Sequence, residues 1–127
     1  MSKSIHSIAE RVGKICLALP EASREVKGDH HIFSVSKKVF AYFLNNHHGD
    51  GIVSLCCKVG PGDNQLLVNA QPDRFYLPAY IGPRGWVGLR LDVGSEKVDW
   101  EEVEELAKDS YRRTAAKRLA ELVKVLS

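Results

Sequence analysis

Arg84 is a candidate for chemistry with an anion, because it stands between two glycines in the stretch YIGPRGW (80–86). Glycine permits backbone angles that other residues avoid, and proline stiffens a turn, so the arginine is predicted to project from a fixed loop. Tyr80 and Trp86 flank it. A guanidinium between two aromatic rings can meet a base, a phosphate or a carboxylate. In a plainer interpretation, Trp86 packs in the core and Arg84 is a solvated turn charge.

Four further cations fall in a predicted turn and a predicted helical region. Lys37 and Lys38 lie in the turn, and Arg113 and Lys117 lie on one side of the C-terminal helical region. Cationic side chains grouped in this way can pair with phosphates. Alternatively, cations late in a helix that begins with glutamates simply complement the helix dipole. We predict phosphate contacts from this group of residues: Lys37, Lys38, Arg84, Arg113 and Lys117.

Two histidine pairs and a cysteine pair are weaker candidates for a metal site or a reactive thiol. His30-His31, His47-His48 and Cys56-Cys57 are neighbours in sequence, and adjacent residues of a strand point to opposite faces. No spaced Cys or His motif is present, so we expect neither a metal nor another cofactor. Only Lys58 stands next to Cys57 to favour a thiolate. The sequence groups no acid, base and nucleophile, and we expect a non-enzymatic protein.

The composition indicates one globular domain over residues 1–127. Hydrophobic residues make up 44% and charged residues 27% of the chain, which suffices for a single buried core. The net charge is +2 and the pI is about 8.5, below the value of about 9 typical of an evident nucleic-acid domain. Three cysteines suit a reducing compartment, and no apolar run is long enough to span a bilayer. We therefore expect a cytoplasmic location and no membrane partner.

These candidates need a scaffold, and the hydrophobic periodicity predicts its first half. Apolar residues recur at spacings of three and four over 4–19, which indicates an amphipathic helix that ends at Pro20. Residues 31–59 are rich in β-branched and aromatic types and are interrupted at 36–37 and 45–51. This pattern predicts three successive antiparallel strands joined by two turns.

The second half continues the same α+β pattern. Asp63 is the predicted N-cap of a short helix over 63–70, and alternation over 86–91 predicts a fourth strand. A capping box at Asp99 begins the C-terminal helical region, whose two apolar stripes point in different directions. We predict a bend, or two helices, meeting near 113–116. The predicted fold is an antiparallel sheet of four or more strands, packed by an N-terminal helix, a short central helix and a C-terminal helical region.

Several stretches give the chain a resemblance to the MmcQ/YjbR family along nearly its whole length. They include ICLALPEASREV, SLCCKV and PDRFYLPAYIGPRGWVGLRLD, and the most specific part is the aromatic-Gly-x-x-Gly-Trp-Val run at 80–87, followed by the pair Ser110-Tyr111. The resemblance implies a CyaY-like fold and a double-wing arrangement for which DNA binding has been proposed. The wings would be the turns at 36–38 and 45–51. Family members often carry a proline after the Ser-Tyr pair, where this chain has Ala115 and Ala116.

Two functions follow as hypotheses. The first is a DNA-binding module of broad sequence tolerance, in which the predicted cations contact phosphates and Tyr80 or Trp86 stacks on bases. The second is a domain that binds an anionic small molecule or a protein through the surface formed by Tyr80, Arg84 and Trp86. A concave cleft at that surface favours the second hypothesis, and convergence of the cations on one side favours the first.

Overall fold

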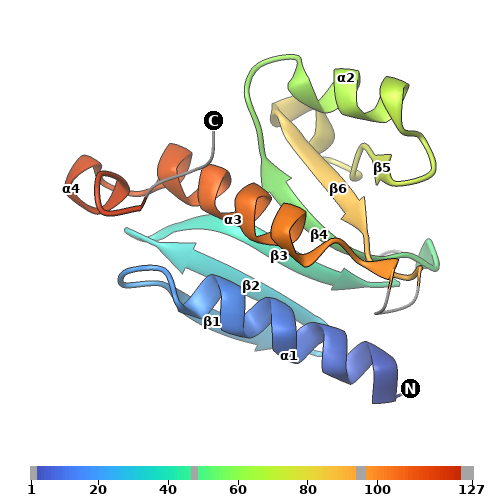
Figure 1. The fold of residues 1–127 in the computed structure, drawn as a ribbon, viewed down its shortest axis with the longest axis horizontal. Helices are drawn as coiled ribbons and strands as arrows, with labels where there is room; N and C mark the ends of the chain where they lie inside the picture. Colours follow the sequence, from blue (N-terminus) through green and yellow to red (C-terminus); the bar gives the residue numbers. More distant parts are fainter. Residues whose placement is uncertain (1–2, 47–48, 94–96, 124–127) are drawn as a thin grey trace.

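A six-stranded antiparallel sheet forms the centre of the computed structural model, which describes residues 3–46, 49–93 and 97–123 (Figure 1). The strand order is β1-β2-β3-β4-β6-β5. The strands are β1 Ser23–Lys27, β2 His30–Val35, β3 Lys38–Asn45, β4 Val53–Lys58, β5 Phe75–Tyr76 and β6 Trp86–Arg90. The predicted α+β class, with an antiparallel sheet of four or more strands, is confirmed.

Two long helices cover one face of this sheet, where they lie side by side (Figure 1). The two long helices are α1 Lys3–Leu17 and α3 Trp100–Thr114. Two shorter helices are α2 Asp63–Ala70 and α4 Lys117–Ala120. Ile8, Val12 and Cys16 of α1 are buried, as their helical spacing predicts. The short α2 packs beside β5, and α4 lies at the left-hand end of the molecule in Figure 1.

The strands send alternate side chains to two different faces. Phe33, Leu55 and Val87 are fully buried and belong to the main core, together with the inner residues of α1 and α3. Leu44, Cys56 and Trp86 point to the other face, which we call the open face, and form a smaller apolar cluster there. The sequence alternation in β3, β4 and β6 therefore serves two packing layers rather than one.

Two details differ from the sequence-based expectation. Strand β1 is an edge strand whose five residues are all exposed. Its sequence therefore lacks the apolar alternation of a half-buried strand, and β1 was not predicted. The predicted N-cap Asp63 is wrong: Gly62, with a φ of 79°, holds the N-cap position of α2, and no side chain caps the helix. Proline at position 61 and the left-handed glycine already turn the chain sharply, so Asp63 becomes the first helical residue.

The hydroxyl of Ser110 joins helix α3 to two neighbouring strands. It accepts a hydrogen bond from the backbone N–H of Lys58 at 2.9 Å and donates one to the carbonyl oxygen of Phe40 at 2.6 Å. Phe40 is the extra residue of a β-bulge, because Phe33 pairs with Ala41 and Ser34 with Val39. A fully buried side-chain hydroxyl thus satisfies two backbone groups where β3 and β4 stop pairing with each other.

The predicted helix break is confirmed, and it occurs without proline or glycine. Helix α3 ends at Thr114, and Ala115 and Ala116 are extended, with ψ angles of 155° and 146°. The break lets both apolar stripes reach the core, since Val103 of one stripe and Leu119 of the other are both buried. The freed backbone N–H of Ala116 donates to Ser36 Oγ at 3.1 Å, which attaches the β2–β3 turn to the α3–α4 junction.

Candidate anion-binding cleft

Two adjoining hollows share three cationic side chains, from Lys58, Arg84 and Arg113. The first has a volume of about 780 Å³ and lies between the segment after β4, the start of α2 and the turn at 82–85. The second, of about 360 Å³, extends toward the open face and adds Lys38 to the lining. We call the two hollows together the basic cleft. Three separate parts of the chain supply its shared cations: the end of β4, the turn before β6 and the last turn of α3.

Lys58 is a cleft cation that was absent from the residues predicted to contact phosphate. It is the last residue of β4, it is exposed, and it pairs with Trp86 of β6 in the sheet register. The bond to Ser110 fixes its backbone. A signal was present in the sequence, because Lys58 is the first charged residue after the buried run 53–57 and so had to emerge at a strand end. A single lysine beside a cysteine pair nevertheless gave no reason to group it with distant arginines.

The loop that carries Arg84 is fixed at both ends by one side chain of α2. Asn64 Nδ2 donates to the carbonyl oxygens of Gly82 and Trp86, at 2.8 and 3.1 Å. Gly85 adopts a φ of 94°, and its carbonyl accepts a hydrogen bond from the N–H of Val59 at 3.0 Å. The predicted role of the glycine frame is confirmed for Gly85, since a residue with Cβ is strained at this angle. Arg84 is exposed at the centre of this loop.

Arg113 reaches the cleft from the last turn of α3. Its Nε lies 2.9 Å from Asp109 Oδ2, one helical turn earlier. A Cβ on Gly60 would lie 2.6 Å from Asp63 Oδ2 and 3.4 Å from Arg113 Nη2, so these two side chains approach each other over the bare glycine. The carbonyl ends of α3 also favour a cation at this position. Arg113 is therefore held in place by an acidic neighbour on its own helix.

An aromatic pair forms one wall of the second hollow. The rings of Tyr42 and Trp86 lie 5.3 Å apart between centroids, inclined at 53°, and both residues line the hollow. Trp86 is only 8% exposed, so it combines the two interpretations of the sequence: it is packed, and it borders the cleft. Tyr80 is 80% exposed and lies outside the lining of both hollows. Tyr42 is thus an aromatic partner of Trp86 within the lining of the cleft.

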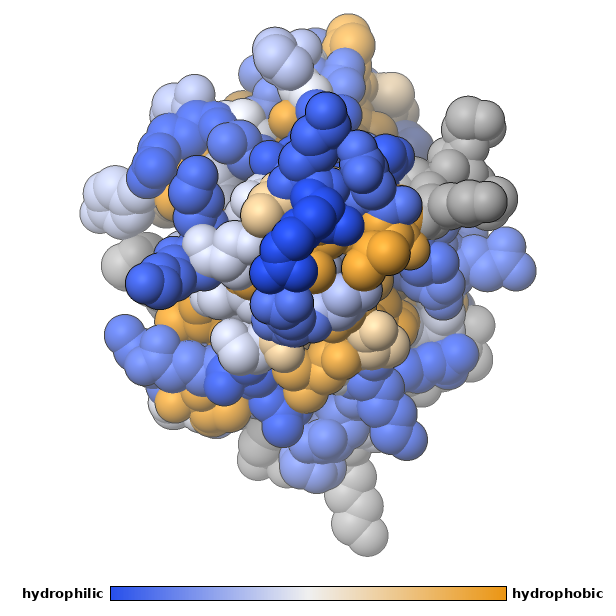
Figure 2. All heavy atoms as spheres, turned by 90° about the vertical axis from the view of Figure 1, so that its left-hand side faces the viewer, coloured by the Kyte–Doolittle hydropathy of each residue, from blue (hydrophilic) through white to orange (hydrophobic). Residues whose placement is uncertain are grey.

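The remaining predicted cations lie on the same end of the molecule but outside the cleft lining. Lys37 is exposed in the β2–β3 turn, and Lys117 is exposed at the start of α4. Lys37 follows Ser36 in the chain, and Lys117 follows Ala116. Because Ser36 and Ala116 are joined by a hydrogen bond, the backbones of the two lysines lie close together. Figure 2 shows that the face carrying α4 is mostly hydrophilic, with apolar patches between the polar side chains. Five predicted cations therefore gather at one end, three of them in the cleft.

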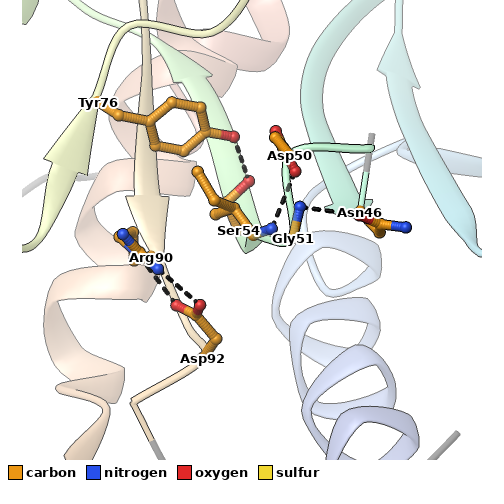
Figure 3. Close-up of polar contacts among 8 residues, drawn as sticks. Asn46, Asp50, Gly51, Ser54, Tyr76, Arg90 and Asp92 are labelled. Atoms are coloured by element: carbon orange, nitrogen blue, oxygen red, sulfur yellow. Dashed lines mark hydrogen bonds and ion pairs between the residues drawn. The ribbon is translucent and has the colours of Figure 1, made fainter. Parts of the chain in front are cut away.

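The second predicted wing, between β3 and β4, has a different character (Figure 3). Asn46 Oδ1 accepts from the N–H of Gly51 at 2.8 Å, and Asp50 Oδ1 accepts from the N–H of Ile52 at 2.9 Å. His47 and His48 lie outside the described residues. At this end of the open face Arg90 is paired with Asp92 at 2.8 Å. The described part of this turn uses its polar groups to stabilise itself.

The three thiols are all buried, which opposes their use as nucleophiles. Burial raises the pKa of Cys16 to about 12 and that of Cys56 to about 11, and it raises the pKa of Cys57 well above its ordinary value. Tyr76 donates or accepts one hydrogen bond with Ser54 at 2.7 Å, and burial raises its pKa as well (Figure 3). Among the described residues, the groups that shift these pKa values are thiols, hydroxyls and carboxylates, not the cations that activate a thiol or a phenol.

Two further kinds of feature are absent from the described residues. No three His, Cys, Asp or Glu side chains within 3–46, 49–93 and 97–123 are grouped as a metal site requires. Across the same part of the chain, no helix has both the length and the apolar character needed to cross a membrane.

The fold and the cleft define a small α+β domain with helices on one sheet face and a cationic hollow at one end. The model of the YjbR family matches residues 17–113, so the chain belongs to the YjbR family. The match includes Lys38, Lys58, Arg84 and Arg113 and ends before Lys117. The crystal structure of the Deinococcus radiodurans protein DR2400, a DUF419 domain, is similar in fold, with a TM-score of 0.63 and 23% identity over 83% of this chain and 76% of that one. No curated protein matches the chain.

Proposed function

We propose that this YjbR-family protein is a non-enzymatic module that binds nucleic acid through phosphate contacts at its basic end. The observation that supports the proposal best is the convergence of Lys58, Arg84 and Arg113 on one cleft from three separate parts of the chain. Lys38 joins them, and Lys37 and Lys117 extend the cationic surface beyond the cleft. In this proposal the β2–β3 turn acts as a wing, and the turn between β3 and β4 contributes little charge.

The physical basis of the proposal is that most cations of the cleft are not neutralised by a nearby carboxylate within the described chain. Among the described residues, no carboxylate forms an ion pair with Lys38, Lys58 or Arg84. Exposed cations of this kind attract phosphates and release condensed counterions when they bind. Contacts to phosphates carry no sequence information directly, so binding should tolerate many sequences. A broad sequence tolerance is therefore part of the proposal.

Fluorescence anisotropy with a labelled 20-mer of mixed sequence tests this function. Between about 50 and 200 mM salt, roughly five phosphate contacts should cost two to three orders of magnitude in affinity. The double variant Lys38→Gln and Arg84→Gln should weaken binding and reduce the salt dependence. Each single substitution, Lys38→Gln or Arg84→Gln, is compared with Lys27→Gln as its charge-matched control, which removes one exposed cation at the opposite end of β2, where Lys27 pairs with His30. Affinity that is absent or indifferent to salt contradicts the proposal.

A second candidate function is supported by the concavity of the site. The larger hollow, at about 780 Å³, is within the range of about 300 to 1,000 Å³ that small-molecule sites occupy. Its lining combines apolar groups, such as Val59 and Leu77, with the three shared cations. We propose an anionic small molecule as the alternative ligand. Saturable binding that persists at high salt, with no affinity for the 20-mer, would favour it.

A further inference from the structure

We infer that the basic cleft receives a phosphomonoester carried by a nucleoside, with the phosphate among Lys58, Arg84 and Arg113 and the base against Tyr42 and Trp86. This inference rests on the proposed function and deepens it. A free mononucleotide and a phosphorylated strand end share this chemistry. Of the two, the proposed function points to the strand end.

The first argument is charge. A phosphodiester within a strand carries one negative charge, whereas a phosphomonoester carries about 1.5 to 2 at neutral pH. Three cationic side chains line the same hollow, and only Arg113 has a carboxylate partner among the described residues. Guanidinium groups also present donors in a geometry that matches several phosphate oxygens at once. A terminal phosphate therefore matches the concentration of positive charge better than an internal one.

The second argument is shape. A duplex presents its backbone as a convex surface, and such a surface contacts the rim of a hollow rather than its interior. The lining of the larger hollow includes the start of α2 on one side and the turn at 82–85 on the other. A strand end or a single nucleotide can enter between them. Lys58, Arg84 and Arg113 are exposed where they line this hollow, so a terminal group that enters it can contact all three.

The third argument is preorganisation. Asn64 fixes the loop of Arg84 at both ends, Ser110 fixes the backbone of Lys58, and Asp109 holds the Arg113 side chain. The backbone at Lys58, the loop that carries Arg84 and the side chain of Arg113 are therefore each held by a side chain from a helix. A site that is already ordered loses little conformational entropy on binding, so its donors are more useful to a small ligand.

The fourth argument is the wall of the second hollow. Tyr42 and Trp86 line it together with Val39 and Ile81, beside the same three cations. Tyr42 is partly exposed, and its ring packs on Trp86. Aromatic faces stack on bases with little regard to base identity. A planar base next to the phosphate would fill this hollow, which an inorganic ion would leave empty.

Anisotropy with three labelled single strands of twelve thymidines tests the inference: one with a 5′-phosphate, one with a 3′-phosphate and one with hydroxyls at both ends. We expect one phosphorylated strand to bind about tenfold or more tightly than the hydroxyl strand, because an added charge-assisted contact has about that effect. Thymidine monophosphate should compete at the same site, and thymidine and inorganic phosphate should compete at least about tenfold less well. Lys58→Gln should abolish the preference for the phosphorylated end, whereas Lys117→Gln should weaken all three strands and keep the preference. Circular dichroism confirms that each variant is folded.

The outcomes separate this inference from the proposed function. Salt-dependent binding with equal affinity for all three strands overturns the terminal-phosphate site and leaves the nucleic-acid function standing. Binding of thymidine monophosphate without any strand overturns the nucleic-acid function and supports the site, with the free nucleotide as its source. Inorganic phosphate that competes as well as the nucleotide overturns the contact with Tyr42 and Trp86.

Discussion

Ser110 of α3 accepts a hydrogen bond from the backbone amide of Lys58 at 2.9 Å, although 52 residues separate them in the chain. The same hydroxyl donates to the carbonyl of Phe40. A residue of the core therefore positions a residue of the cleft. The neighbouring Tyr111 has a similar structural use, since its hydroxyl donates to the carbonyl of Pro20 at 2.6 Å and its ring packs edge-on against Phe40. The Ser110-Tyr111 pair thus fastens α3 to three other segments.

Ser110→Ala should lower the free energy of unfolding by about 1 to 3 kcal/mol, because it leaves a partly buried N–H and a buried carbonyl without this hydroxyl partner. Urea unfolding followed by circular dichroism measures the change. Ser23→Ala, an exposed position of β1, is the matched control and should change stability by less than about 0.5 kcal/mol. Equal effects of the two substitutions would show that the Ser110 bonds do not stabilise the fold.

Asn64→Asp should disable the clamp on the Arg84 loop. The substitution replaces an amide donor that serves Gly82 and Trp86 by a carboxylate that repels both carbonyls, at a cost of about 1 to 3 kcal/mol in unfolding free energy. Anion binding should weaken as well, since the loop is no longer fixed and a negative charge enters the cleft. Asn69→Asp on the same helix is the control, because its Oδ1 accepts from Gln65 and a carboxylate still can. The clamp is refuted if both variants unfold at the same urea concentration.

The sequence predicted most of the regular elements. The β-branched and aromatic run over 31–59 predicted β2, β3 and β4, the alternation over 86–91 predicted β6, and α2 was predicted with its observed bounds, 63–70. The helix break followed from two apolar stripes that no straight helix can bury together. Edge strand β1 could not be predicted in this way, because an exposed edge shows no periodic burial. Local pattern therefore sufficed where an element contributes apolar side chains to the core.

The cleft itself depends on tertiary geometry. Lys38, Arg84 and Arg113 were predicted as separate contacts, and nothing in their spacing shows that they line the same hollow. Lys58 and Tyr42 were missed, since each looks like an ordinary member of a strand until the β4–β6 register and the β3 bulge are known. Strand pairings between residues distant in sequence bring these side chains together.

His31 should make the protein less stable as the pH falls below about 6.5. Burial, followed by the charge of Arg24, lowers the pKa of its imidazole in the folded state, and Nδ1 is buried without a hydrogen-bond partner within the described structure. Because the folded pKa lies below the unfolded value of 6.5, the unfolded chain takes up the proton first. The stability is fully present above pH 6.5 and is lost as the pH falls toward the folded pKa.

The measurement is the free energy of unfolding of the wild type and of His31→Phe, at several pH values from 8 to 5. Phenylalanine suits the site, since His31 packs edge-on against Phe43 at 5.5 Å between ring centroids. The difference between the two proteins should be constant near pH 8 and should shift in favour of the variant on acidification. A difference that stays constant over the whole range would show that His31 does not titrate differently in the two states.

Asp63→Asn should strengthen anion binding in the basic cleft. Asp63 Oδ2 and Arg113 Nη2 both lie against the position that a Cβ on Gly60 would occupy, so the carboxylate competes with a ligand for that guanidinium. Its removal should raise the affinity for a phosphorylated strand by about three- to tenfold, a moderate effect because Asp63 is exposed and screened. Asp29→Asn changes the net charge equally, at an exposed site in the turn between β1 and β2, and is the matched control. If both substitutions strengthen binding by the same factor in titrations at about 0.1 M salt, total charge rather than the local contact determines affinity.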